Sequence, residues 1–454
     1  MLVEKSIESF DVVIVGGGVS GLSAAVYLSN KNYKVALVEQ NKILGGRTNS
    51  FINNKFGDEV DNGQHVMMGC YFDTLNYLRL IGAIDGCYIQ QKLSIVFRLK
   101  NNKEFKLQAS NLPSPFHILT GILRLKEFTF SEKISLIKVG FIIKNINTDD
   151  KYLQNLTVED WLNSLNQSEK LKKYIWNIIS IATLNESTKN VSALLFLKIL
   201  KEIFFGKKSN SAMIIPRNGL SKLFVEKGIS FIEENGGRVF NQTEITNYKI
   251  KRNEISEVSL SNKVKLSTKG LILAIPYYAI KNNPVNIFYP KIDFNKHFIS
   301  SAIITIHLWF EGKWLNEKFV ALVDSPLHWI FNHSAIKVDY SQSRQYISIV
   351  ISGANLLISK SKSEIFNMTI KELEKFYPTS KNHKLLDWKV IKEKRATFSP
   401  TIGLDKWRPS AITKMENVFL AGDWTDTQLP ATIEGGIKSG FIAAKLFEEK
   451  VTTY

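Results

Sequence analysis

The sequence has few cysteines, no long apolar run and too few acidic residues to balance its lysines. Its two cysteines, Cys70 and Cys87, cannot form a disulfide framework and lack the spacing of a metal site, so we expect a reduced protein without bound metal. No apolar stretch reaches the roughly 18 residues of a membrane-spanning helix. The first ten residues lack the apolar segment of a secretory signal, and we therefore expect a cytoplasmic protein.

The formal net charge is +17. Because the lysines are dispersed and no nucleic-acid motif accompanies them, we expect no nucleic-acid partner. Two explanations stay open, a lysine-rich bias of the whole surface or attraction to an anionic membrane, which is worth about 1 kcal/mol per basic residue at the surface. An apolar content of 44% over 454 residues is enough to form the core of more than one domain.

A nucleotide-binding pattern lies near the N-terminus. An apolar strand expected at 11–15 leads into a turn and a helix at 22–30, and a second strand at 34–38 ends in Glu39. That carboxylate stands where an acceptor for ribose hydroxyls is expected. The order of these elements predicts a Rossmann-like unit in an α/β fold, in which glycines allow the turn, the approach of a pyrophosphate and the packing of the helix. The three glycines at G-x-G-x-x-G spacing are Gly16, Gly18 and Gly21.

A second glycine motif, Gly45, Gly46 and Arg47, follows the ribose acid. It resembles the second fingerprint of FAD-dependent enzymes of the amine oxidase and phytoene desaturase kind, which NAD enzymes do not usually carry. The resemblance implies FAD as the cofactor in place of NAD. It also implies that the two glycines let the backbone pass close to FAD, and that Arg47 offers a charged fork to phosphate or to the flavin edge.

The stretch at 61–71, DNGQHVMMGCY, resembles one group within this broad class of FAD-dependent enzymes. It is similar to the corresponding stretch of bacterial hydroxysqualene dehydroxylases, which are squalene-associated relatives of the phytoene desaturases. On this resemblance we expect His65 to be the catalytic proton donor and Tyr71 to be the second candidate. From the residues alone, His65 reads instead as a core histidine with satisfied hydrogen bonds.

The C-terminal part of the chain carries a matching motif. Residues 417–423 form an expected buried strand that ends in Gly422 and Asp423. In FAD enzymes of this type such an aspartate accepts hydrogen bonds from the ribityl hydroxyls. A helix then begins, and the resemblance places Thr432 and Ile433 at its N-terminus, where the helix dipole favours negative charge on a reduced flavin.

The middle of the chain divides into two kinds of segment. Residues 72–215 carry helical periodicity with few strand signals, while strand signals return at 301–310 and 346–352. Short strands at 239–274 resemble the returning part of an FAD domain, where the backbone of Val239 would contact the adenine. We expect an FAD-binding domain of the glutathione reductase type with an inserted α+β substrate domain. The first comprises residues 1–71, 212–276 and 393–454, and the second comprises 72–211 and 277–392.

The resemblance implies an FAD-dependent reductive dehydroxylation of hydroxysqualene to squalene, in squalene and hopanoid biosynthesis. Two alternatives stay open. One is a carotenoid desaturase of the phytoene type or another amine oxidase-like oxidoreductase, because fold analogy alone does not separate these. The other is a non-catalytic FAD-binding partner in an isoprenoid assembly.

The expected partners follow from this chemistry. We expect a long-chain isoprenoid substrate and, since only one G-x-G-x-x-G unit is present, an external electron donor or reductase. We also expect peripheral contact with the inner face of the cell membrane. The helix expected at 192–205 is apolar almost all round, so it would lie in the core, line a lipid tunnel or lie in a membrane interface.

Overall fold

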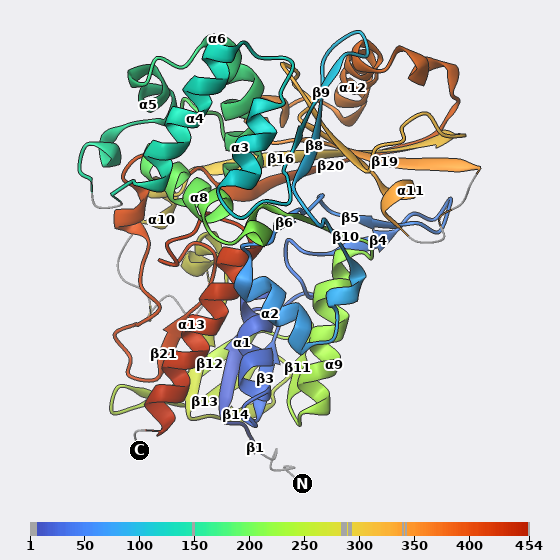
Figure 1. Ribbon diagram of the computed structural model, residues 1–454. Coiled ribbons are helices and arrows are strands. Elements are labelled where there is room, and N and C mark those ends of the chain that lie inside the picture. The colour runs from blue at the N-terminus through green and yellow to red at the C-terminus, as the bar shows by residue number, and fades with distance from the viewer. Residues whose placement is uncertain are drawn as a thin grey trace.

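Two sheets, one above the other in Figure 1, organise the chain. The computed structural model describes residues 7–147, 150–282, 288, 293–337, 340 and 343–452. Residues 1–6, which belong to the stretch in which we expect no secretory signal, lie outside the described residues. No helix in the described ranges is long and apolar enough to cross a membrane.

The lower sheet is parallel throughout. In spatial order its strands are β11 (Arg238–Phe240), β3 (Val35–Val38), β2 (Val12–Val15), β15 (Gly270–Leu273) and β21 (Val418–Leu420). Every residue of β2, β3, β15 and β21 is buried, as expected for short apolar strands that are covered on both faces. Strands from the beginning, middle and end of the chain thus bring their carboxyl ends to one edge.

Helices cover one face of this sheet and a smaller sheet covers the other. Because side chains alternate along a strand, Ile14 packs among the helices, whereas Val13 packs with Val258 and Leu266 of the smaller sheet. The helices are α1 (Val19–Ser29), α2 (Phe72–Leu80), α9 (Lys227–Glu234, preceded by a π-helical segment, Ser221–Glu226) and α13 (Ile433–Thr452). The strands of the smaller sheet are β1 (Ile7–Ser9), β14 (Lys265–Ser267), β13 (Glu254–Leu260) and β12 (Ile245–Lys251).

The upper sheet is mixed. In spatial order its strands are β20 (Leu385–Phe398), β16 (Ser300–Glu311), β19 (Arg344–Ile351), β18 (Trp329–Asn332), β17 (Phe319–Leu322), β8 (Ser94–Arg98) and β9 (Glu104–Gln108). Helix α12 (Lys362–Phe376) covers one face with Ile365, Leu373 and Phe376. Strand β20 runs across the boundary expected at 392/393.

A group of helices covers part of the other face of the upper sheet, at the upper left of Figure 1. Two begin with the capping box that satisfies the first free amides, at Thr129 and at Thr157. The helices are α3 (Phe116–Leu123), α4 (Phe130–Lys144), α5 (Val158–Ser164), α6 (Glu169–Leu171), α7 (Asn177–Leu184) and α8 (Ala193–Phe205). The apolar side chains of α8 are buried or partly buried in this group, which favours the core interpretation of that helix.

The expectation of few strands between 72 and 215 is wrong at β8 and β9. This hairpin joins the upper sheet, where Phe97 and Phe105 stack across the strands at 4.8 Å. Asn101 and Asn102 both take positive φ in its turn, a conformation that asparagine tolerates better than most residues. The Asn101–Asn102 pair is therefore the turn signal in the sequence that would have predicted this hairpin. The shorter elements are β4 (Ser50–Ile52), β5 (Glu59–Asp61), β6 (Met67–Met68), β7 (Cys87–Ile89), β10 (Met213–Pro216), α10 (Phe294–His297) and α11 (His333–Ile336).

Buried histidines in and around the upper sheet predict a loss of stability in acid. Burial lowers the pKa of His307 to about 3 and that of His328 to about 4, and it lowers the pKa of His333 well below its usual range. The folded rings stay neutral, while the unfolded chain binds protons below about pH 6.5, so their stabilising contribution is complete above that pH and is lost as the pH falls towards these values.

We expect His307→Gln to reduce the loss of unfolding free energy between pH 7 and pH 5 by about 2 kcal/mol relative to wild type, measured by urea unfolding. His383→Gln, at a partly exposed position, is the control. An equal acid loss in wild type and His307→Gln would contradict the expectation.

Candidate functional site

The turn between β2 and α1 leaves an open space against the backbone. A Cβ atom added to Gly18 would meet no atom within 4 Å, whereas one added to Gly21 would lie 1.8 Å from the Gly16 carbonyl oxygen. Gly21 is therefore required for the helix to pack on the turn, and Gly18 leaves room beside the first amides of α1. This arrangement fits a pyrophosphate at a helix N-terminus, so the residues present suit the dinucleotide that the motif predicts.

The second glycine motif lies directly against the first. The Gly45 amide donates to the Gly17 carbonyl at 2.8 Å, and Gly18 and Gly45 pair as an isolated bridge. A Cβ atom on Gly46 would lie 3.6 Å from the Gly18 Cα. The two motifs therefore form one continuous wall of backbone, which is open at Gly18 and Gly46.

Glu39 connects the end of β3 to this wall. Its carboxylate is 8% exposed; Oε2 accepts from the Gly17 amide at 2.7 Å, and Oε1 accepts from the Asn41 amide and side chain at 2.8 and 2.7 Å. A carboxylate has about four acceptor positions, so one remains for a ribose hydroxyl. Val239 lies at the same edge, because the Glu39 amide donates to the neighbouring Phe240 carbonyl.

Arg47 joins the beginning of the chain to its end. Its guanidinium forms an ion pair with Asp423 at 2.7 Å and donates to the Ala396 carbonyl at 2.7 Å. Gly422, before this aspartate, has its amide bound to the Ser439 hydroxyl of α13 at 2.8 Å. The predicted phosphate-side arginine and ribityl-side aspartate are thus direct partners in the structure.

A residue that sequence reasoning missed, Arg408, holds the loop after Asp423. Its guanidinium is buried and donates to the carbonyls of Leu429 (2.7 Å), Asp423 (2.9 Å) and Thr425 (2.6 Å), and to the Thr427 hydroxyl at 3.1 Å. Burial lowers the pKa of this arginine. In the sequence it is one basic residue among many in a polar stretch, and nothing local distinguishes it from a surface arginine.

The loop that carries His65 lies between the two sheets. Ser348 of β19 donates to the Gln64 side-chain oxygen at 3.3 Å, and a Cβ on Gly63 would lie 3.8 Å from Thr305 of β16. The His65 Nδ1 is 2.9 Å from the Gly63 carbonyl, which only accepts, so Nδ1 carries a proton. Burial lowers the pKa of His65, and the nearby Arg47 charge adds to the shift, so the ring is neutral near pH 7 with Nε2 free to accept.

Tyr71, the second candidate donor, stands where α2 and α13 begin. Burial raises its pKa, and a hydrogen bond with the Thr432 side chain opposes that shift. Glu434 fixes the two helix starts together, because its carboxylate accepts from the Asp73 amide (3.0 Å), the Thr74 amide (2.9 Å) and the Thr74 hydroxyl (2.6 Å). Tyr71 therefore keeps its proton and lies next to the predicted flavin-facing end of α13.

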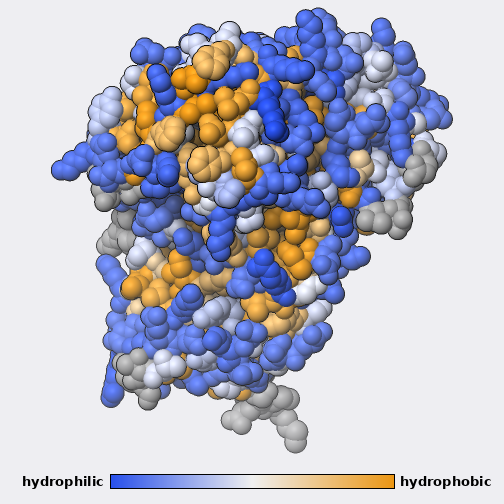
Figure 2. Space-filling model, in the orientation of Figure 1, coloured by the Kyte–Doolittle hydropathy of each residue, from blue (hydrophilic) through white to orange (hydrophobic). Residues whose placement is uncertain are grey.

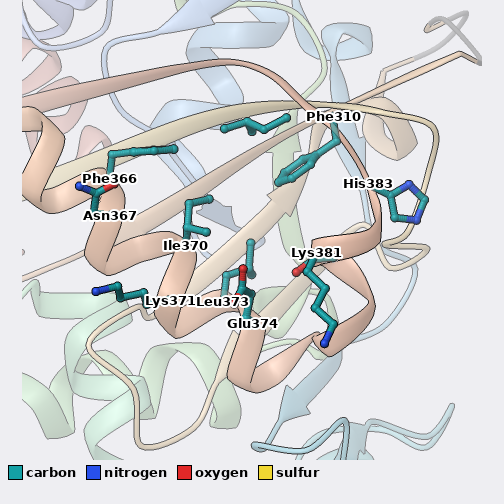
Figure 3. Close-up of a pocket in the computed structure, with 11 residues that line it drawn as sticks. Phe310, Phe366, Asn367, Ile370, Lys371, Leu373, Glu374, Lys381 and His383 are labelled. Carbon is teal, nitrogen blue, oxygen red and sulfur yellow. The ribbon is translucent and has the colours of Figure 1, made fainter.

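The pocket in Figure 3 is separate from these residues. It has a volume of about 310 Å³ and lies between α12 and the upper sheet, with Phe310, Ile370 and His383 in its wall. Phe310 belongs to the cluster beneath α12, whereas Trp309 packs with Val60 in a different cluster. Because neighbouring side chains on β16 point to opposite faces, the pocket is across the sheet from the His65 loop.

Cys70 and Cys87 are free and buried, and burial raises the pKa of each thiol to about 12. Within the described ranges no group of three or more metal-binding side chains is arranged around a common point. His328 lies just before β18, and its Nδ1 accepts from the Ser352 amide at 3.0 Å. This bond assigns it a structural role at the end of β19.

Comparison with known proteins identifies the relatives of this chain. The sequence pattern of the family described as flavin containing amine oxidoreductase matches residues 19–446. A hydroxysqualene dehydroxylase of Zymomonas mobilis is 26% identical over 439 residues, covering 95% of this chain and 98% of that protein. A 15-cis-phytoene desaturase of an Oncidium hybrid is 26% identical, covering 96% of this chain and 77% of that protein. The fold is similar to that of cyclohexylamine oxidase from Brevibacterium oxydans, with a TM-score of 0.72 and 15% identity over 97% of this chain and 99% of that one.

The contacts of Glu39 predict its effect on FAD binding. We expect Glu39→Gln to weaken FAD binding by about 1–3 kcal/mol, because one oxygen becomes an NH2 group that cannot accept, so the Gly17 amide, the Asn41 contacts and the ribose hydroxyl must share a single uncharged acceptor. Fluorescence titration of the deflavinated protein measures the change. Glu8→Gln is the matched control, since Glu8 pairs with Arg238 in a partly exposed ion pair. If Glu39→Gln binds FAD with the affinity of wild type, the ribose of FAD is not bound by Glu39.

Proposed function

We propose, from the premise that this chain belongs to the flavin containing amine oxidoreductase family and is an FAD-dependent oxidoreductase, that it reduces hydroxysqualene to squalene. The observation that carries the proposal is that two side chains able to pass a proton to a leaving hydroxyl, His65 near the Arg47 charge and Tyr71 bonded to Thr432 at the start of α13, lie close to residues that would hold FAD. Removal of a hydroxyl group needs such a proton, whereas desaturation does not. The similarity to hydroxysqualene dehydroxylase over nearly all of both chains supports the same substrate.

We infer that FAD is held in the manner of the glutathione reductase type. The parallel order of the lower sheet supports this, since the glycine turn lies at the carboxyl end of a central strand. Val239 and Glu39 would hold the adenosine, the amides after Gly18 the pyrophosphate, and Asp423 the ribityl chain. Arg47 would meet phosphate or the flavin edge, and Thr432 and Ile433 would face the ring. The domain division at 211/212 and 276/277 remains a proposal, supported by the separation of the two sheets. The boundaries expected at 71/72 and 392/393 do not follow that separation, because α2 packs on the lower sheet and β20 continues in the upper sheet to Phe398.

The chain contributes a proton and an apolar environment to the proposed reaction. When bound and reduced, FAD supplies a hydride. The protonated hydroxyl would leave as water when its C–O bond breaks, and the allylic carbon would gain the hydride. Each turnover then consumes two electrons from an external donor or reductase and two protons, of which one leaves in the water and the other enters the product as part of the hydride. Val66 and Met68, which follow His65 in the chain, pack against a large apolar cluster. This surface excludes the bulk water that would otherwise capture an allylic cation.

Carotenoid desaturation is the second candidate function, and the similarity to phytoene desaturase supports it. It removes hydride from a polyene and therefore needs an electron acceptor in place of a donor. A non-catalytic FAD-binding role is the third. An anaerobic experiment separates the three. We expect photoreduced enzyme to reoxidise in one turnover when hydroxysqualene is added, with the flavin absorbance as readout. Bleaching of the flavin in oxidised enzyme by an isoprenoid hydrocarbon would establish a desaturase. A flavin absorbance that changes with neither compound would leave a binding role.

The lowered pKa of His65 predicts how the rate depends on pH. Only the doubly protonated ring donates from Nε2, and its population falls as the pH rises above a pKa that lies below 6.5. We expect kcat/KM to fall about tenfold per pH unit between pH 7 and pH 9, and we expect His65→Gln to lower the rate by about 100-fold and to flatten this limb.

Tyr71→Phe is the matched comparison, because it removes the other candidate proton and keeps the ring. A pH-independent rate that Tyr71→Phe abolishes and His65→Gln preserves would assign the proton to Tyr71.

A further inference from the structure

The outer side of α3 and α4 exposes more large apolar side chains than folding requires. Figure 2 shows apolar surface gathered over these two helices. Helix α4 buries Leu136, Val139 and Ile143 inward and still presents Phe141 to solvent. A helix at a water-facing surface normally has a polar outer face, and a contiguous apolar patch marks an interaction site. We call the following set the α3–α4 surface: Leu112 (47% exposed), Phe116 (55%), Leu123 (45%), Phe130 (74%), Phe141 (59%) and Ile142 (40%).

Free basic side chains surround the α3–α4 surface, and its acids are already engaged. Glu127 pairs with Lys170 at 2.8 Å, and Glu132 caps α4 while it accepts from Ser168. The electrostatic character of this surface is therefore basic, which favours an anionic partner and opposes a second copy of the same surface. The exposed basic residues are Arg124, Lys126, Lys138 and Lys144.

Apolar packing continues from this surface inward to the candidate site. The cluster beneath α3 and α4 includes Leu125, Leu136 and Val139, and the same cluster receives Val66 and Met68, which follow His65 in the chain. A lipid entering beneath the two helices would therefore meet apolar side chains along its way to the proposed proton donor. The opposite side of the upper sheet, under α12, belongs to another cluster.

We propose that the α3–α4 surface docks on an anionic lipid bilayer, with its phenylalanines in the interface and its lysines and Arg124 on the headgroups. The proposal rests on the proposed function only for its purpose, which is delivery of a membrane-dissolved isoprenoid. Apolar side chains that enter the interface, together with basic residues beside them, are the features that hold monotopic proteins on membranes.

The test uses the FAD-loaded full chain and vesicles of phosphatidylcholine with or without phosphatidylglycerol, read by co-sedimentation. We expect binding to the anionic vesicles that weakens with added salt. The triple variant Phe116→Ser, Phe130→Ser, Phe141→Ser should lower the partition coefficient by about tenfold or more. The control triple, Ile299→Ser, Leu356→Ser and Ile412→Ser, changes side chains of 58, 91 and 62% exposure outside this surface and should bind as wild type.

Equal binding by the α3–α4 triple and wild type would overturn the proposal, and so would equal loss in the control triple. A wild-type dimer that the α3–α4 triple dissociates would also overturn it, because the surface would then join two copies. Flavin absorbance and turnover of detergent-dispersed hydroxysqualene should be unchanged in the α3–α4 triple. Vesicle binding without turnover by wild type would refute the proposed function and still support the docking surface.

Discussion

The ion pair between Arg47 and Asp423 is the contact on which the site depends. It joins the loop after the first βαβ unit to the loop before the last helix, and the same arginine reaches the end of β20 through Ala396. Arg47 thus meets two segments that lie 349 and 376 residues later in the chain. Arg408 then holds the loop that carries the aspartate, so two arginines keep one wall of the cofactor space in place.

The first half of the site could be predicted from local sequence because its geometry is local. Gly18, Gly21 and Glu39 lie within a single βαβ unit, where the turn, the helix and the second strand determine one another. Gly45 and Asp423 followed from resemblance to a family, since spacing alone cannot show that segments so far apart will touch. The structure places both at the same edge of the lower sheet.

The remaining features depend on long-range packing that leaves no local pattern. Glu434 is buried and caps α2 from another helix, and Arg408 is a buried charge in a stretch that reads as surface. The strands β8 and β9 belong to the upper sheet, whose other strands lie about two hundred residues later in the chain. The neutral state of His65 comes from burial and from the Arg47 charge, neither of which a residue string displays.

The parallel sheet brings the residues that would hold the cofactor to one edge, and the upper sheet binds the His65 loop, in which Val66 packs against a large apolar cluster. The central claim is that this arrangement removes a hydroxyl group rather than hydrogen from an isoprenoid. The most direct measurement is the mass of the product after anaerobic incubation of reduced enzyme with hydroxysqualene. The account predicts squalene, lighter by one oxygen atom than the substrate. Recovery of unchanged hydroxysqualene from enzyme whose flavin stays reduced would contradict it.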